Sequence, residues 1–401
     1  MKLAEGKPME RKVVVTGIGI LCALGNNKVE VLKALADQTT GIKKAEMCSA
    51  YKDLEYVKVG ISNFEQVELN HPEELDKIEK MTKQVLDEAL RDAGLTVQDL
   101  EKEGLRASFS MSTSLAGTDH LLKYLDLGKQ DPMWILKTRA FISRLAAAYK
   151  IGGGFYTTSS ACAAGTAGAG IAFDLIRNGA ADVVVTGGAD HISLFSIFGF
   201  NALKSLSRDI SKPFDAERDG INIGEASVFF IFEEYEHAKK RNARCYGEII
   251  GYGLANDAYH ITSPDPKGAG AIQAMTMALQ DAKANKEEIG YINAHGTGTS
   301  ANDQMELKAI REVFGDFPVV SSTKSRTGHC LGAAGSIELY FSLLSIYEGL
   351  LPETWNSRLD MEGDWSFKAA NDSGPIEYAL SNSFAFAGNA ASILIRAMDH
   401  V

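Results

Sequence analysis

The chain has 401 residues, of which 45% are hydrophobic and 23% are charged, which is ordinary for a globular enzyme. Its length favours two or three domains or one large duplicated unit, and a core of that size needs no disulfide or metal to stabilise it. The formal net charge of −11 argues against a protein that wraps nucleic acid, and the 38 glycines form neither a collagen repeat nor a low-complexity tract.

The cysteines and the apolar stretches indicate the compartment. The five cysteines are widely spaced and include no Cys-x-x-Cys pair, so the sequence predicts neither a disulfide framework nor a zinc site. The beginning of the chain, Met1–Lys12, is polar and charged, which is not typical of a secretory signal peptide. No uninterrupted apolar stretch reaches the length of a membrane-spanning helix. We therefore expect a cytoplasmic enzyme without a membrane or nucleic-acid partner.

The first predicted elements are a buried strand, a helix and a second strand. Val13–Gly17 is rich in β-branched residues, and its last glycine together with Gly19 resembles the start of a dinucleotide-binding turn. The third glycine of that motif is missing, so a tight turn within a buried strand is favoured. Asp76–Ala93 has apolar residues at helical spacing before Gly94, and Arg106–Met111 is the next expected strand.

The middle of the chain contains a segment of unusually small residues. Thr157–Gly170 consists of Thr, Ser, Ala, Cys and Gly, and it continues into a helix that is expected to end at Gly179. Glycine costs about 0.5–1 kcal/mol in a helix relative to alanine. Several glycines in one helix therefore indicate that something must approach its backbone closely. Asp182–Gly188 follows as a buried strand.

A second series of strands and helices begins after about residue 245. Tyr291–His295 and Val319–Thr323 are predicted strands that end in polar residues, and Gly332–Leu350 is a long helix with another small-residue start. The alternation of strands and helices predicts an α/β fold with buried sheets. Because both halves place a small-residue helix after such a strand, we expect an internal duplication, divided into residues 1–250 and 251–401.

Cys162 is the first candidate for chemistry. It lies where a strand or loop meets the start of the small-residue helix, and the partial positive charge of a helix N-terminus lowers the pKa of a thiol. The small neighbours leave room for a substrate. The alternative is a small cysteine that is simply buried, which is common in proteins.

Two histidines have matching settings in the second half. His295 precedes a Gly-Thr-Gly-Thr turn. His329 comes five residues after Lys324 and directly follows a glycine. Histidines beyond the carboxyl ends of strands are suited to donate hydrogen bonds to a developing oxyanion. Each alone is more often a structural residue, and a Cys/His hydrolase would leave the matching settings unexplained.

Three segments resemble the active-site motifs of β-ketoacyl-acyl-carrier-protein synthases of the KAS II type and of related type II polyketide ketosynthases. These segments are Thr158–Gly165, Asn293–Thr299 and Ser322–His329. Lys212–Gly220 and Asn382–Phe384 are further signatures of that family. Their order and spacing match from Val13 to Arg396, so the resemblance covers nearly the whole chain.

The resemblance implies a thiolase-type fold with five layers, α-β-α-β-α, and duplicated halves. The first half carries the nucleophile Cys162, which takes an acyl chain from an acyl carrier protein. The backbone amides of Cys162 and Phe384 are expected to form the oxyanion hole, with Phe384 as the gate. His295 and His329 stabilise the enolate that forms when malonyl carrier protein loses CO₂, and Lys324 supports the charges around His329. No metal or organic cofactor is expected to take part.

The resemblance also implies several binding sites. The phosphopantetheine arm is expected to contact Thr297, Thr299, Thr262 and Ser263. The acyl pocket is expected to include Leu115 and Phe386. A set that supports the site or holds a structural monovalent cation is Glu338, Asn293, Ser381 and Asn382. The basic residues expected to receive the acidic carrier protein are Lys204 and Arg208.

The sequence departs from the family in the loop after Phe384. Ala385 and Ala387 stand where the family has glycine, which is expected to stiffen the loop. A specialised type II polyketide or polyene pathway is therefore an alternative to fatty-acid elongation. A homodimer is expected, or a heterodimer with a chain-length partner. This chain as a non-catalytic partner, or as a thioester hydrolase, is a further alternative.

Overall fold

The computed structural model describes residues 11–65, 70–71, 75–102, 105–126, 133–315, 318–356 and 375–398, without the side chains of 134–141. Most of the polar beginning of the chain, residues 1–10, lies outside these ranges. Across them, every helix is too short or too polar to cross a membrane.

The first half of the chain forms one five-stranded unit of the large sheet, in the order β1-β8-β6-β4-β5. Its strands are β1 (Val13–Cys22), β4 (Ala107–Ser112), β5 (Phe155–Thr158), β6 (Val183–Asp190) and β8 (Ala226–Glu234). Its helices are α1 (Lys28–Ala36), α2 (Lys77–Ala93), α3 (Val97–Leu100), α4 (Thr118–Asp126), α5 (Met133–Ala148), α6 (Ala164–Arg177), α7 (Leu194–Ala202) and α8 (Tyr235–Lys240). A separate small sheet consists of β2 (Ile42–Lys44), β3 (Lys58–Gly60) and β7 (Ile223–Gly224).

The second half repeats the same strand order, β9-β13-β12-β10-β11. Its strands are β9 (Gly247–Asn256), β10 (Ile289–Asn293), β11 (Val319–Ser321), β12 (Tyr378–Phe384) and β13 (Asn389–Arg396). Its helices are α9 (Ala269–Ala282), α10 (Ser300–Phe314), α11 (Lys324–Thr327) and α12 (Ala334–Tyr347). The strand directions also repeat, because β8 and β13 are antiparallel to both of their neighbours, whereas the remaining pairs within each unit are parallel.

The two units are joined by a short antiparallel pairing of Val13–Val15 with Gly247–Ile249. The repeated topology begins again with β9, so the division expected between residues 250 and 251 falls inside this strand.

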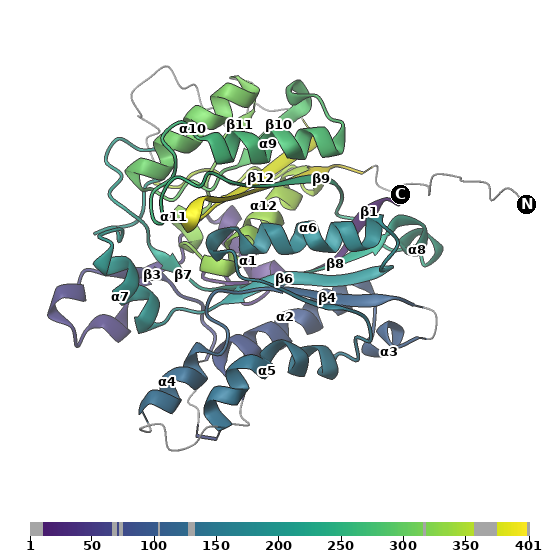
Figure 1. Cartoon of the computed structure of the whole chain (residues 1–401), viewed down its shortest axis with the longest axis horizontal. Coiled ribbons are helices and arrows are strands. Elements are labelled where there is room, and N and C mark those ends of the chain that lie inside the picture. The colour runs from purple at the N-terminus through teal and green to yellow at the C-terminus, as the bar shows by residue number, and fades with distance from the viewer. Residues whose placement is uncertain are drawn as a thin grey trace, which may run out of the picture.

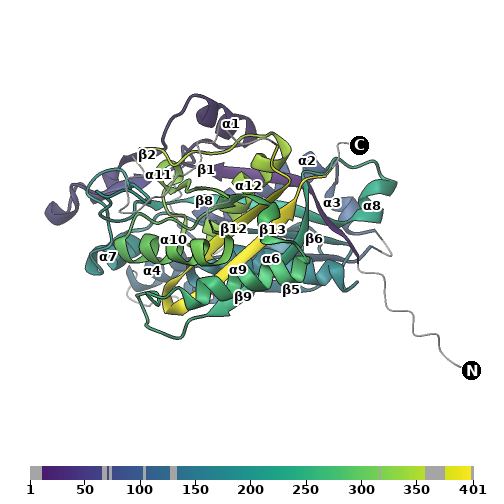
Figure 2. The same ribbon diagram turned by 90° about the horizontal axis from the view of Figure 1, so that it is seen from above.

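Five layers follow from this arrangement. Figure 1 shows α9 and α10 above the C-terminal unit, α6 and α12 between the two units, and α2 and α5 below the N-terminal unit. Seen from above, α9 and α10 lie across the outer face of the C-terminal unit (Figure 2). In the described ranges, the buried apolar side chains form three clusters, represented by Val85, Tyr340 and Met275. The expected thiolase-type architecture is therefore confirmed.

The two central helices touch at glycines, as the small-residue segments predicted. A Cβ atom on Gly165 of α6 would lie 2.5 Å from the backbone nitrogen of Ser336, and one on Gly335 of α12 would lie 2.3 Å from Thr166 Oγ1. Both distances are shorter than any van der Waals contact, so only glycine fits. The close approach brings the N-terminal ends of α6 and α12 together in the middle of the molecule.

The glycines near the start of the chain pack against a helix. The expected tight turn is absent, because β1 runs from Val13 to Cys22 with only a register shift between Val15 and Gly17. A Cβ atom on Gly17 or Gly19 would lie 2.3 or 2.1 Å from a carbonyl oxygen of α2. Both glycines therefore let α2 lie directly on the strand, and no nucleotide-binding turn is formed.

Candidate active site

Cys162 lies on a strained turn between β5 and α6. Ala161 has a φ of 50°, a left-handed conformation that is unusual for alanine, and it begins a 3₁₀ turn, Ala161–Ala163, that leads into the helix. The turn directs the buried side chain of Cys162 out of the N-terminal end of α6 and across to the C-terminal half.

His295 lies two residues beyond β10, and a buried carboxylate holds its backbone. Glu306 on α10 accepts hydrogen bonds from the amides of His295 and Gly296, both at 2.7 Å. Asp303, one helical turn earlier, accepts a bond from the amide of Gly298 at 3.2 Å. The acidic side of α10 thereby fixes the turn that presents the imidazole.

His329 follows α11 and is held by backbone contacts on both sides. Its amide donates to the carbonyl oxygen of Asn222 at 2.7 Å. Its ring nitrogen Nδ1 accepts a hydrogen bond from the amide of Leu331 at 3.1 Å. Because Nδ1 is an acceptor, the proton of the neutral ring is on Nε2.

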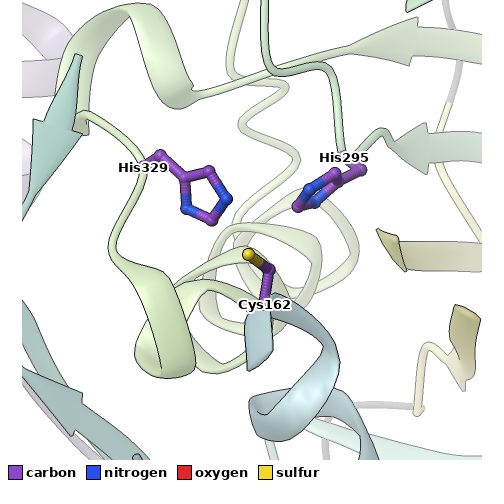
Figure 3. Close-up of side chains that lie close together, drawn as sticks. All are labelled: Cys162, His295 and His329. Carbon is purple, nitrogen blue, oxygen red and sulfur yellow. The ribbon is translucent and has the colours of Figure 1, made fainter. Parts of the chain in front are cut away.

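The three side chains meet in one place (Figure 3). The sulfur of Cys162 and one ring nitrogen of each histidine all lie within 4.8 Å of one another. The two imidazole planes are nearly perpendicular, at 85°, with ring centroids 5.3 Å apart. Both rings face the sulfur from the opposite half of the molecule, as the sequence predicted.

Lys324 supports His295, whereas the sequence argument associated it with His329. Its buried ammonium group lies 3.2 Å from His295 Nδ1, and it also bonds to the His295 carbonyl oxygen and to the Glu338 carboxylate. An ammonium group only donates, so His295 Nδ1 is the acceptor and Nε2 carries the proton. Both histidines therefore present an Nε2–H donor.

The protonation states fit such donors. Burial lowers the pKa of both histidines well below 6.5, and the positive charge of Lys324 lowers it further. Both rings are consequently neutral at neutral pH. A neutral imidazole with its proton on Nε2 can donate one hydrogen bond to an oxygen atom that gains negative charge.

The expected lowering of the Cys162 pKa is wrong for the substrate-free site. Burial raises the pKa of this thiol to about 12, which outweighs the opposite effect of Lys324. The structure therefore contains a thiol at neutral pH. Its proton has to leave when sulfur attacks, so the reaction must provide an acceptor for it.

One sulfur and two imidazoles are also ligands that zinc prefers. Lys324 argues against that interpretation, because its ammonium group lies 3.2 Å from a nitrogen of His295 and would repel a dication. The donor set fits an oxyanion site better than a metal centre.

A cavity of about 270 Å³ connects this group to the surface. Its lining comes from both halves and includes Cys162, Phe200, Leu203, Ser205, Ile221, Thr262, Ser263, Pro264, His295, Thr297, Thr299, Ala301, Asn302, His329, Phe384, Ala385 and Phe386. The four expected pantetheine contacts are thus all in the wall. Thr297 and Thr299 are also bonded to each other, with their hydroxyl oxygens 2.9 Å apart.

The two phenylalanines of the C-terminal loop have different settings. Phe384 ends β12, is buried, and packs its ring at 68° against His295, with centroids 6.2 Å apart. Phe386 is half-buried and stacks on Phe200, with centroids 5.8 Å apart. The next residue, Ala387, has a φ of 60°. Phe384 is therefore part of the fixed wall, and Phe386 lies where the chain leaves the strand.

The remaining expected residues are the acyl-pocket residue Leu115, the two basic residues and the supporting set, which lie in three different places. Leu115 is buried in the apolar core of the first half and is not in the wall of the cavity as far as the described residues define it. Lys204 and Arg208 are exposed, and Lys204 lies between the wall residues Leu203 and Ser205.

The expected supporting set lies beneath the histidines. Asn293 Oδ1 and Ser381 Oγ are buried without a hydrogen-bond partner in the described part of the chain, so they are oxygen donors available to a cation. Glu338 is bonded to Lys324 and to Ser383. The side-chain oxygen of Asn382 accepts a hydrogen bond from Ser392, so this oxygen already has a partner.

Sequence reasoning missed three buried acidic residues that position the site: Asp190, Asp303 and Glu306. The last two are three residues apart on a helix that directly follows the His295 turn, and this spacing was the available signal. Asp190 gives no local signal, because its partners are distant in the sequence.

Comparisons with known proteins agree along the whole chain. The model of the β-ketoacyl synthase N-terminal domain matches residues 10–238, and that of the C-terminal domain matches residues 246–358. The 3-oxoacyl-[acyl-carrier-protein] synthase 2 of Vibrio cholerae serotype O1 is 33% identical over 418 residues, which covers 97% of this chain and 100% of the relative. Nodulation protein E of Rhizobium leguminosarum bv. trifolii is 34% identical over 411 residues, with 97% and 100% covered.

Solved structures give the same result. A β-ketoacyl synthase from Burkholderia phymatum STM815 superposes with a TM-score of 0.83 at 28% identity, and covers 97% of this chain and 100% of its own. A type II PKS ketosynthase, solved with its acyl-carrier protein, has a TM-score of 0.86 at 30% identity and the same coverage. The matched domains, the fold and the Cys-His-His site together show that this chain belongs to the β-ketoacyl synthase family.

Proposed function

We propose that the protein catalyses a decarboxylative Claisen condensation in fatty-acid elongation. An acyl chain on Cys162 reacts with malonyl-acyl carrier protein and gives 3-oxoacyl-acyl carrier protein and CO₂. The observation that carries this proposal is the meeting of one thiol with two Nε2–H donors in a cavity open to the surface. The 3-oxoacyl-[acyl-carrier-protein] synthase 2 name of several relatives supports it.

The first step transfers the acyl chain from carrier protein to enzyme. The sulfur of Cys162 attacks the thioester carbonyl, the carbonyl oxygen becomes negative, and the pantetheine sulfur leaves. The proton of the Cys162 thiol ends on the sulfur of the departing pantetheine, so the transfer is balanced in protons. The oxyanion is held by the amide of Cys162 and by an amide of residues 384–386.

The backbone hydrogen bonds of this loop limit which amide can be the second donor to the oxyanion. Ala385 donates its amide to the carbonyl oxygen of Asn389 at 2.8 Å. The amides of Phe384, expected from the sequence, and of Phe386 are therefore the two candidates. For the gate we favour Phe386, because its ring is half-buried and stacks on another side chain of the wall.

The second step breaks the bond between the malonyl carboxylate and its neighbouring carbon. The electron pair stays on the thioester fragment as an enolate, and the Nε2–H groups of His295 and His329 hydrogen-bond its oxygen. The carbanion then attacks the acyl-Cys162 carbonyl and displaces the cysteine sulfur, which takes up one proton from solvent. Removing one such donor typically costs about 10²–10³ in rate.

The surroundings of the cavity have supporting roles. Thr297, Thr299, Thr262 and Ser263 would bond the amides of the pantetheine arm. Lys204 and Arg208 would attract the acidic carrier protein to the mouth. Leu115 would limit acyl length from behind the site.

We further propose a monovalent cation beneath the histidines. Asn293, Ser381, Glu338 and Asn382 would hold it, and its charge would offset that of the carboxylate. No organic cofactor is proposed, because loss of CO₂ drives the condensation.

We propose a homodimer formed along the edge strand β5, whose Phe155 is 50% exposed. A heterodimer with a chain-length partner is the alternative, since one solved neighbour is a ketosynthase/chain length factor. That neighbour and the alanines at 385 and 387 also favour, as the second candidate function, a ketosynthase of a specialised type II polyketide pathway. A cytoplasmic location stays a prediction.

The direct test is an acyl adduct on the intact protein. Mass spectrometry after incubation with a carrier protein that bears an acyl chain should detect the acyl adduct on the wild type and no adduct on Cys162→Ala. A His295→Ala variant is expected to keep the adduct and lose CO₂ release from malonyl carrier protein. An adduct that persists in Cys162→Ala refutes the nucleophile. Competition among carrier-bound acyl chains of graded length and unsaturation then separates the two pathways.

A further inference from the structure

A buried carboxylate links two loops that approach the site from different halves. Asp190 ends β6 and has no exposed surface. Its Oδ1 accepts hydrogen bonds from Thr113 Oγ1 at 2.7 Å and from the amide of Leu115 at 2.9 Å. The amide of Ser114 lies 2.9 Å from Oδ2, and the amide of Gly332 lies 2.7 Å from the same oxygen.

The contacts in the first half fix the turn that carries Leu115. Thr113 Oγ1 itself accepts a hydrogen bond from the amide of Ala116 at 3.0 Å, so hydroxyl and carboxylate close this turn together. Leu115 is 5% exposed and packs in the core. The position of its side chain therefore depends on Asp190.

The contact in the second half fixes the turn that carries His329. Gly332 lies in the 3₁₀ turn Leu331–Ala333, and the preceding amide, of Leu331, bonds to His329 Nδ1. A Cβ atom on Gly332 would lie 2.7 Å from Asp190 Oδ2, so the carboxylate is in direct contact with this backbone. Moving it would shift the imidazole.

The internal duplication strengthens this interpretation. Leu331 has a φ of 51° and Ala161 a φ of 50°, and each begins the turn that leads into a central helix. Gly332 is thus the counterpart of Cys162. In the second half, the amide at that position already holds an anionic oxygen.

We infer that Asp190 is a positioning residue that holds the Leu115 turn, behind the cavity, and the imidazole of His329 in one fixed relation. The inference rests on the proposed condensation. The carboxylate accepts from four donor groups, whereas an asparagine has one acceptor oxygen and would turn an N–H toward one of the amides. Asp190→Asn keeps the size of the side chain and breaks the link.

The test separates the two steps of the reaction. For Asp190→Asn, we expect the rate of CO₂ release from malonyl carrier protein, divided by the fraction of protein whose Cys162 can be acylated, to fall by about tenfold. This loss is smaller than the roughly 10²–10³-fold loss typical when a hydrogen-bond donor to the oxyanion is removed. We also expect a changed order of preference among short, medium and long acyl-carrier proteins. The fraction of protein that forms the acyl adduct provides the normalisation.

Asp182 supplies the matched control. It lies just before β6 at the opposite end of the strand, and its carboxylate is bonded to Arg11 and Arg106. Asp182→Asn is expected to lower stability without changing acyl preference or normalised CO₂ release. If it changes them as Asp190→Asn does, the effect is one of general stability and the inference is wrong.

A second variant covers the case in which Asp190→Asn does not fold. Thr113→Val removes one hydroxyl from the Leu115 turn, and it is expected to alter acyl preference with CO₂ release unchanged. Unaltered preference overturns the inference. If the wild type catalyses condensation and Asp190→Asn has the same CO₂ release and acyl preference, only the role of Asp190 is refuted. If the wild type forms no acyl adduct, the proposed function is refuted as well.

Discussion

Lys324 has contacts that lead in two directions, so one substitution tests two statements about the site. Its buried ammonium group reaches His295 at Nδ1 and at the carbonyl oxygen, and it pairs with the carboxylate of Glu338. Lys324→Met keeps most of the side-chain volume and removes every one of these contacts. We expect stability to follow the Glu338 contact and activity to follow the His295 contact.

The effect on stability follows from the charge that remains. Breaking a buried ion pair costs about 3–5 kcal/mol when the other member stays charged. Burial already raises the pKa of Glu338 to about 7, so once Lys324 is gone this acid takes up a proton instead of keeping a buried charge, and this uptake costs stability at neutral pH because the unfolded acid is ionised. We therefore expect Lys324→Met to lower the free energy of unfolding by about 3 kcal/mol, the lower end of that range. The double variant with Glu338→Gln is expected to recover most of this loss.

The effect on activity follows from the His295 ring. Without Lys324, no donor among the described residues holds His295 Nδ1 as an acceptor, and part of the population moves its proton from Nε2 to Nδ1. CO₂ release is then expected to fall by about 10–100-fold, which is less than the loss of a whole donor. Urea unfolding and CO₂ release measured on the same preparations test both effects. A double variant that regains stability and also full CO₂ release would refute the claim that Lys324 fixes the His295 tautomer.

Three further predictions concern other parts of the molecule. Gly165→Ala is expected to lower the free energy of unfolding by about 1–3 kcal/mol, because its Cβ atom would lie 2.5 Å from the backbone of α12; unchanged urea unfolding contradicts this. Glu306→Gln leaves one of two amides in the His295 turn without its acceptor, so CO₂ release is expected to fall by about tenfold while acylation of Cys162 continues; equal losses in both steps contradict it. Below about pH 6.5, His295 and His329 are each expected to lower stability by about 1.4 kcal/mol per pH unit, because the unfolded chain binds protons that these buried rings refuse, whereas Glu306 and Glu338, with pKa values raised to about 7, act in the opposite direction; urea titrations of the wild type and of His329→Gln at several pH values isolate the histidine contribution, and equal pH slopes for the two proteins contradict it.

The sequence was most informative where the chemistry is local. Cys162, His295 and His329 each lie in a short segment that resembles an active-site motif of the family, so their meeting could be expected. The partner of Lys324 could not, because the chain turns after β11 and brings the ammonium group to His295, 29 residues away in sequence. The raised pKa of Cys162 also depends on burial by both halves, which no local pattern records.

The fold was predictable in its order and less so in its details. Alternating strands and helices indicated the α/β fold, and the small-residue helix starts in both halves indicated the duplication. The glycines of the helix after Cys162 indicated a close neighbour. The glycines at positions 17 and 19 were misread, because a glycine that makes room for a helix and a glycine that allows a turn are identical in sequence. Only the packing of α2 separates the two cases.

The equivalent turns at Ala161 and Leu331 show that the two repeats of this fold have the same backbone and carry different reactive groups. The first repeat has the sulfur of Cys162 after this turn residue. The second repeat has Gly332 at the equivalent position, in contact with the carboxylate of Asp190. The second copy has become the bearer of imidazoles. Neither repeat holds a complete set of reactive groups, so catalysis belongs to the pair, and a fragment with only one repeat would be inert however well it folded.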